Sequence, residues 1–146
     1  MANQAFSLRP ATEADFEAVL ALSIRAMREH LERIGRFDPE RRRSRMRRQF
    51  DAGILRIIEQ AGTMAGCIGV EAEASAVEIH SLFLDTHAQR QGLGEAVFQA
   101  VLAAHTGQPF RIEVLQQSPA RRFWERQGFV LTGESEFDWL MERAPD

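Results

Sequence analysis

Residues 77–96 read VEIHSLFLDTHAQRQGLGEA: an apolar run, a polar loop that ends in two glycines, and the start of a helix. The first N–H groups of a helix have no partner inside the helix, and the positive end of its dipole attracts anions. Gly92 and Gly94 lack side chains, so the backbone around them can approach a ligand closely. The stretch therefore predicts a strand, a phosphate-binding loop and a helix in succession.

Two common phosphate-binding motifs do not fit this loop. The dinucleotide fingerprint requires a third glycine at position 97, where the chain has valine. The P-loop requires a lysine, and the chain has none, because all 18 basic residues are arginine. The lack of lysine also excludes a pyridoxal Schiff base, and the lack of tyrosine excludes a phenol as general acid.

Hydrophobic periodicity and turn residues predict the elements on either side of this stretch. The predicted strands are Phe6–Arg9, Ile54–Glu59, Met64–Ala72, Val77–Leu84 and Phe110–Leu115, with two closing strands near Phe129 and Trp139. The predicted helices are a first one from Thr12 to Gly35, then Arg41–Ala52, Gly92–His105 and Pro119–Gln127. Hairpins mixed with crossover helices indicate an α/β (α+β mixed) fold, in which a mixed central sheet carries helices on both faces.

The composition narrows the class of protein. A length of 146 residues fits a single domain, residues 1–146, which can bury one core without disulfides or metals. Cys67 is the only cysteine, and the four histidines lack the spacing of a metal site, so we expect no metal. The first residues, MANQAFSLRP, form no apolar stretch of signal-peptide length, and no later run reaches membrane-spanning length, which predicts a cytoplasmic protein without a membrane partner.

The net charge of −3 conceals an asymmetry, because residues 25–48 carry ten arginines against four acidic residues. One interpretation is a solvated helix face; the other is a site for an anionic substrate or partner.

Two ordered motifs carry a resemblance to a known family. The loop has the pattern QxxGxG between a strand and a helix, and Ser118–Phe129 reads SPARRFWERQGF. Both are similar to signatures of the GNAT acyltransferases, the second to NPARRxYERxGF. The opening segment LRPATEADFEAVLAL, residues 8–22, also resembles the first strand and helix of that family. The resemblance covers nearly the whole chain.

The resemblance implies an acetyl-CoA-dependent N-acetyltransferase whose mostly antiparallel sheet splays between its fourth and fifth strands. It implies that the backbone of Leu82 and Leu84 pairs with the pantetheine arm, and that N–H groups from Arg90 to Glu95 hold the diphosphate. The implied cofactor-binding residues are Leu82, Phe83, Leu84, Gln89, Arg90, Gln91, Gly92, Leu93, Gly94, Glu95, Ser118, Ala120 and Trp124.

Acyl transfer to an amine needs a proton acceptor, because an alkylamine with a pKa near about 10 is mostly protonated at neutral pH. Glu78 lies where histone-acetylating GNAT members carry their base, and strand alternation predicts that it shares one face with His80, Leu82 and Leu84. His80 could assist or replace it. Glu113 resembles the glutamate that ribosomal-protein acetylating members place in this strand. The three catalytic candidates, and a water chain, stay open.

Two departures from the family pattern bear on the chemistry. Trp124 stands where the family has a tyrosine often proposed to protonate the departing thiolate, and Ser118 replaces an asparagine. This leaves a second interpretation, a catalytically inactive acyl-CoA-binding or sensing module. Cys67 has no evident activating base, so we expect direct attack in a ternary complex and no ping-pong route.

The resemblance places the acceptor, a small molecule or a peptide amine, against the first two helices and their loop, which include Arg33 and Phe37. The basic residues there predict an amine that also bears a carboxylate or phosphate. A nucleic-acid partner bound through Arg41–Arg48 is disfavoured, because the rest of the chain is acidic and few aromatics are interleaved. The acceptor, the acyl chain and the oligomeric state, a homodimer included, stay open.

Overall fold

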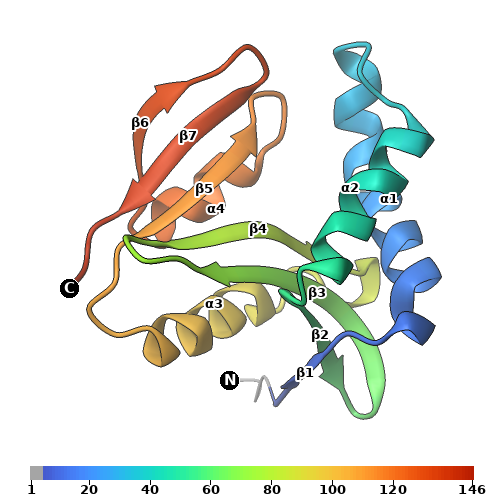
Figure 1. Cartoon of the computed structure of the whole chain (residues 1–146), viewed down its shortest axis with the longest axis horizontal. Helices are drawn as coiled ribbons and strands as arrows, with labels where there is room; N and C mark the ends of the chain where they lie inside the picture. Colours follow the sequence, from blue (N-terminus) through green and yellow to red (C-terminus); the bar gives the residue numbers. More distant parts are fainter. Residues whose placement is uncertain (1–4) are drawn as a thin grey trace.

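The computed structural model of the chain describes residues 5–146 (Figure 1). Within this range seven strands form one sheet in the order β1-β2-β3-β4-β5-β7-β6. The strands are β1 (Ser7–Pro10), β2 (Leu55–Gln60), β3 (Thr63–Ala72), β4 (Val77–Leu84), β5 (Phe110–Leu115), β6 (Val130–Glu134) and β7 (Asp138–Arg143). Among these strands only β4 and β5 pair in parallel. The predicted mixed, mostly antiparallel sheet is confirmed.

The helices follow the predicted order along the chain. They are α1 (Phe16–Arg33), α2 (Pro39–Asp51), α3 (Leu93–Ala104) and α4 (Ala120–Arg126), with 3-10 helices at Glu13–Asp15 and Thr86–Ala88. No helix in the part of the chain that the structure describes is both long enough and apolar enough to cross a membrane.

Two prolines move element boundaries away from their predicted places. α2 begins at Pro39, two residues before the predicted start at Arg41, because Asp38 caps the helix. The Asp38 carboxylate accepts hydrogen bonds from the N–H groups of Glu40 and Arg41 at 3.0 and 3.3 Å, and proline is favourable in a first turn. β1 continues through Pro10, predicted as a break, because an edge strand tolerates a residue without an N–H.

The helices cover both faces of the sheet and enclose two cores. Neighbouring residues of one strand divide between them, as strand alternation requires. Ile58 of β2 packs in the core under α3 and α4, with Phe98 and Trp124. Ile57 packs in the core under α1 and α2, with Phe16. The strands β2 and β3 are therefore buried on both sides, whereas the core under α1 and α2 contains no residue of β5, β6 or β7.

β4 and β5 are paired only where they begin. Their parallel register runs from Val77 opposite Phe110 to Ile79 opposite Ile112. Beyond that point β5 continues beside β7 while β4 continues beside β3, and the two diverge into a V (Figure 1). The predicted splay is confirmed. From His80 onward β4 has no strand partner on its β5 side, which leaves an open backbone edge.

A bulge interrupts β4 at His80. Gly69 of β3 pairs with Ser81 and the next residue, Val70, pairs with Ile79, so His80 is an extra residue in β4. Ile79 accordingly packs under α3, whereas Ser81, two residues on, donates a hydrogen bond to Gln49 of α2 at 3.1 Å. Side chains two residues apart thus point to opposite faces, as bulges allow.

The bulge corrects one prediction about the sheet faces. Glu78 was expected on the same face as Leu82 and Leu84. Those leucines pack against the α3 core, while Glu78 and His80 face α2. Simple alternation fails here because the extra residue reverses the phase of the strand.

Candidate active site

Two adjoining cavities lie between α2 and the diverging strands. The first, of about 270 Å³, is lined by residues of α1, α2, β4, β5 and α4. The second, of about 380 Å³, lies between the C-terminal half of α2 and the start of β4. The side chains that line both are Arg45, Arg48, Gln49, His80 and Glu113. These residues form the boundary between the two cavities.

α3 begins in a geometry that leaves its N–H groups open. Its N-cap, Gly92, has a φ of 78° and no side chain with which to cap the helix. The N–H groups of Leu93, Gly94 and Glu95 have no partner within a helix, and no hydrogen bond among residues 5–146 uses them. With the helix dipole behind them, these groups form an anion-binding end that fits a diphosphate.

The loop before α3 is braced by its own side chains. Gln89 donates from Nε2 to the carbonyl oxygen of Leu84 at 3.0 Å, and Gln91 donates to that of His87 at 2.8 Å. Arg90 has a φ of 61°, a left-handed conformation that is uncommon outside glycine and recurs at binding loops. The loop is therefore held in shape by the amides of the two glutamines.

Gly94 has a packing role that the sequence analysis did not predict. A Cβ at this position would lie 3.3 Å from the Phe123 ring and 3.6 Å from a methyl group of Leu84. Its φ is not positive, unlike that of Gly92. Gly94 thus lets α3 approach α4 and β4 closely, and Gly92 supplies the special backbone conformation.

The open edge of β4 and the start of α4 face each other across the first cavity. Leu82, Phe83, Ser118 and Ala120 all line it. Leu84 does not line it and packs against the α3 core, which is compatible with the predicted role of its backbone. The cavity is thus bounded on this side by the open strand edge and by residues of the second family-like motif.

Trp124 forms a wall of the first cavity. Its side chain is 4% exposed and lies edge-on to Phe98 and Phe129, with ring centroids 5.5 and 5.3 Å away. Indole has one N–H of very low acidity, so the residue cannot replace a phenol as proton donor. Trp124 contributes shape and a low dielectric.

The three predicted catalytic residues, far apart in the sequence, line the second cavity together. Glu78 and His80 project from β4, and Glu113 projects from β5. His80 Nε2 lies 2.8 Å from an Oε1 atom of Glu71, a carboxylate that can orient the imidazole ring. Only His80 and Glu113 also reach the first cavity.

Burial raises the pKa of Glu78 above its ordinary value. Desolvation is the largest cause, and the nearby charges of His80 and Arg111 oppose it. Arg111 Nε lies 3.5 Å from an oxygen of Glu78, and a second Arg111 nitrogen donates to Glu73. A carboxylate with a raised pKa is a better proton acceptor near neutral pH than an ordinary one.

The two residues predicted for the acceptor do not reach either cavity. Arg33 pairs with Glu29 at 3.2 Å and donates to the carbonyl oxygen of Gln117, also at 3.2 Å. The Phe37 ring lies under the guanidinium of Arg28, with 4.7 Å between Cζ and the ring centroid. Neither residue is among those that line the cavities.

Other residues of the basic segment line the first cavity instead. They are Arg36, Arg41, Arg42, Arg45 and Arg48. The spacing of the arginines in α2 is a signal that could have identified them from the sequence. Arg45 follows Arg41 by four residues and Arg48 follows Arg45 by three, which places the three, with Arg42 beside them, along one side of a helix. Sequence alone did not say which side faces the sheet.

Cys67 is buried in β3 and its thiol is inert. Its side chain is inaccessible to solvent, and desolvation raises its pKa to about 12. A thiol with that pKa carries almost no thiolate at neutral pH. Among residues 5–146 no group of three or more metal-ligating side chains occurs either.

Comparison with known proteins agrees with this geometry. Residues 26–140 match the sequence model of the "Acetyltransferase (GNAT) domain". A search of curated proteins gave no match.

Several solved structures share the fold. The Thermoplasma acidophilum PaiA N-acetyltransferase in complex with coenzyme A aligns with a TM-score of 0.73 and 16% identity, over 96% of this chain and 99% of that one. Ard1 from Thermoplasma volcanium aligns with a TM-score of 0.69 and 22% identity, over 97% and 99%. A GNAT-family acetyltransferase from Streptococcus agalactiae aligns with a TM-score of 0.80 and 14% identity, over 98% and 97%.

Proposed function

The chain belongs to the GNAT acetyltransferase family, and we propose that it transfers an acetyl group from acetyl-CoA to a primary amine by direct attack in a ternary complex. The observation that carries the proposal is an open strand edge that leads from two cavities lined by Glu78, His80 and Glu113 toward the loop before an anion-binding helix end. Acetyl-CoA supplies the acetyl thioester; the chain supplies binding, orientation and a path for the proton.

The residues present fit coenzyme A. The free N–H groups of Leu93, Gly94 and Glu95 suit the diphosphate, and the unpaired edge of β4 from His80 to Leu84 suits the amide groups of pantetheine. Ser118 and Trp124 border the first cavity and would enclose the thioester end of acetyl-CoA. None of these contacts requires a lysine.

Gly92 offers a test of the loop. Gly92→Ala would place a side-chain residue at a φ of 78°, which strains the backbone by about 1 kcal/mol and turns the open N–H groups away from their ligand. We expect the Kd for acetyl-CoA, measured by calorimetry, to rise about five- to tenfold.

The matched control is Gly107→Ala, because Gly107 has a φ of 82° and equally open surroundings beyond the other end of α3. Both variants are expected to lose similar stability, but only Gly92→Ala is expected to bind acetyl-CoA more weakly. Equal affinity for acetyl-CoA in the two variants would show that the loop does not contribute to binding.

We assign Glu78 as the general base and His80 as the group that connects it to the reacting end of the cleft. The raised pKa of Glu78 supports the first role, and the position of His80 at the boundary of both cavities supports the second. Water in the second cavity would carry the proton from the amine to the carboxylate. Glu71 holds the imidazole of His80 in place.

The departing thiolate needs no acid from the chain. A thiol has an unperturbed pKa of about 8.5, so its thiolate is a tolerable leaving group, and Trp124 in place of tyrosine does not prevent the reaction. The buried, inert thiol of Cys67 argues against an acetyl-enzyme intermediate and in favour of direct attack.

The experiment that tests the proposal measures thiol release from acetyl-CoA with a panel of primary amines, beside calorimetry of acetyl-CoA binding. Amine-dependent thiol release is the expected result. Tight binding of acetyl-CoA without turnover on any amine would instead support a catalytically inactive acyl-CoA-binding module.

A further inference from the structure

The arginines of α2 divide between two sides of the helix. Arg43 and Arg47 lie on the α1 side, where they form bidentate ion pairs with Glu17 and Glu13 at 2.8–3.2 Å. The Arg47 guanidinium also lies over the Phe16 ring, with 4.0 Å between Cζ and the centroid. These two charges are compensated and fasten α2 to α1.

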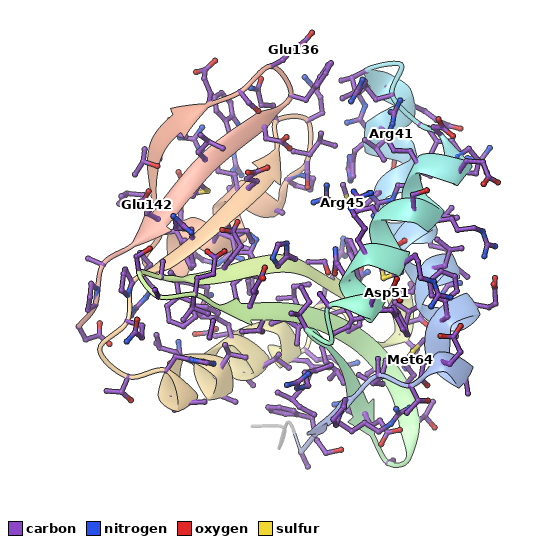
Figure 2. All side chains as sticks on the ribbon, in the orientation of Figure 1. Arg41, Arg45, Asp51, Met64, Glu136 and Glu142 are labelled. Carbon is purple, nitrogen blue, oxygen red and sulfur yellow. The ribbon has the colours of Figure 1, made fainter. Side chains whose placement is uncertain are left out.

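The cavity side of α2 is different. Arg42, Arg45 and Arg48 recur at every third residue there and line the first cavity. None of the three forms an ion pair or a side-chain hydrogen bond with any residue from 5 to 146. Figure 2 shows Arg45 extending from α2 toward the space beside β4 and β5. Three positive charges thus border the cleft without an ion-pair partner, that of Arg42 buried and those of Arg45 and Arg48 exposed.

Arg42 is the most informative of the three. It is only 9% exposed, and its Nε atom is buried without a hydrogen-bond partner. Burial, with the charge of Arg45 beside it, lowers the pKa of Arg42 to about 10, which still leaves the group charged at neutral pH. A buried, charged guanidinium without a partner is unfavourable, so the arrangement suits an anion that enters with a ligand.

The wall opposite α2 carries the reverse charge. Glu71, Glu78 and Glu113 line the second cavity on β3, β4 and β5. The buried hydrogen bond from Ser81 to Gln49 fixes the distance between this wall and α2. A molecule with an amine at one end and an anion at the other would match both walls, with the amine beside the proton acceptors.

We propose that Arg42, assisted by Arg45 and Arg48, binds the carboxylate or phosphate group of a small acceptor whose primary amine is directed at Glu78 and His80. The proposal rests on the proposed acetyltransferase function and specifies the substrate class. A guanidinium donates two parallel hydrogen bonds to a carboxylate or a phosphate, which gives orientation as well as affinity.

Pairs of amines that differ only in the anionic group test the proposal. Suitable pairs are L-phenylalanine with its carboxamide, γ-aminobutyrate with butylamine, and phosphoethanolamine with ethanolamine. In at least one pair we expect the anionic amine to have a kcat/KM at least about tenfold above its partner, since hydrogen bonds to charged groups contribute about 1.5–3 kcal/mol. The pair that responds distinguishes carboxylate from phosphate.

Variants of α2 assign the preference to one residue. Arg42→Gln is expected to lower kcat/KM for the anionic amine at least about tenfold. The kcat/KM for the neutral amine and the KM for acetyl-CoA are expected to stay nearly unchanged. The matched control is Arg43→Gln, which removes the same charge from the α1 side of the same helix. This variant is expected to leave kcat/KM for both amines nearly unchanged. An equal loss in the two variants would contradict the proposal.

A binding measurement separates this proposal from the proposed function. Inorganic phosphate is titrated into protein saturated with coenzyme A, which occupies the loop before α3, and the guanidinium Nε–Hε signals are followed by NMR. Phosphate binding that disappears in Arg42→Gln supports the anion site even if no amine is acetylated, in which case only the proposed function fails. Turnover of neutral and anionic amines at equal rates, without phosphate binding, would overturn the anion site and leave the acetyltransferase function intact.

Discussion

Glu78→Gln is expected to lower kcat by about 10² to 10⁴ at neutral pH, the range usual for loss of a general base. Glutamine keeps the size of the side chain and its place in β4 but cannot take a proton. An alkylamine has a pKa of about 10, so only about one molecule in a thousand is neutral at pH 7 when no base removes its proton.

The pH profile identifies the cause of the loss. As pH rises toward the pKa of the amine, the acceptor loses its proton to water, so the deficit of Glu78→Gln should shrink steadily between pH 7 and 10. A variant damaged only in structure would keep the same deficit at every pH. Steady-state thiol release across this range, with acetyl-CoA saturating, is the measurement.

His80→Gln is the companion variant, because His80 lies at the boundary of the two cavities. We expect it to lose less activity than Glu78→Gln, since water can replace a connecting group. The reverse order would make His80 the base, and full activity in both would favour Glu113 or water.

Glu78→Gln is expected to lose activity at neutral pH without a loss in the free energy of unfolding. The folded-state pKa of Glu78 is raised by burial, so the folded chain holds this proton more tightly than the unfolded chain. The contribution of Glu78 is then most favourable at acid pH and is lost as pH rises through the folded pKa. At pH 7 the variant, whose amide is always neutral, should be at least as stable as the parent, and at acid pH the two should converge.

Gly66→Ala is expected to lower the free energy of unfolding by about 3 kcal/mol, at the upper end of the range for overpacking. A Cβ on Gly66 would collide with the carbonyl oxygen of Phe83 in the adjacent strand, and would lie 3.1 Å from Leu84 Cα. Backbone cannot rotate aside as a side chain can, so β3 and β4 must separate. Because β4 carries the open edge, the KM for acetyl-CoA should rise as well.

Gly133→Ala is the control for this substitution. Gly133 also lies in a strand, β6, but a Cβ there would meet only a Leu140 methyl group at an ordinary 3.5 Å. We expect its denaturation midpoint in urea to stay close to that of the parent. Similar midpoints for Gly66→Ala and the parent would show that the two strands tolerate separation.

Much of the fold could be predicted because local signals agree with the final structure. Val77–Leu84 and Phe110–Leu115 begin and end as predicted, since strong β-formers are bounded by turn residues there. The loop from Gln89 to Gly94 and the helix after it also follow local rules. Asp38 and Pro39 carried a readable start signal for α2, and the prediction still placed the start two residues late.

The parts that could not be predicted depend on contacts between distant segments. The bulge at His80 arises from the pairing of β4 with β3, and the alternation of residues in the sequence does not indicate it. The rotation of α2 about its axis directs Arg42 into the cleft, whereas Arg33 is held by Glu29 and Gln117. Composition indicated a basic lobe, but only packing divides its charges into compensated and free ones.

The extra residue in β4 also bears on how related chains can change in length during evolution. Deleting the one residue between Ile79 and Ser81 would restore regular pairing and leave every other residue of the strand on its present face. Val77, Ile79, Leu82 and Leu84 would all stay in the α3 core. The packing of the sheet therefore tolerates the loss of this residue, and what the loss would remove is the side chain of His80 at the boundary of the two cavities.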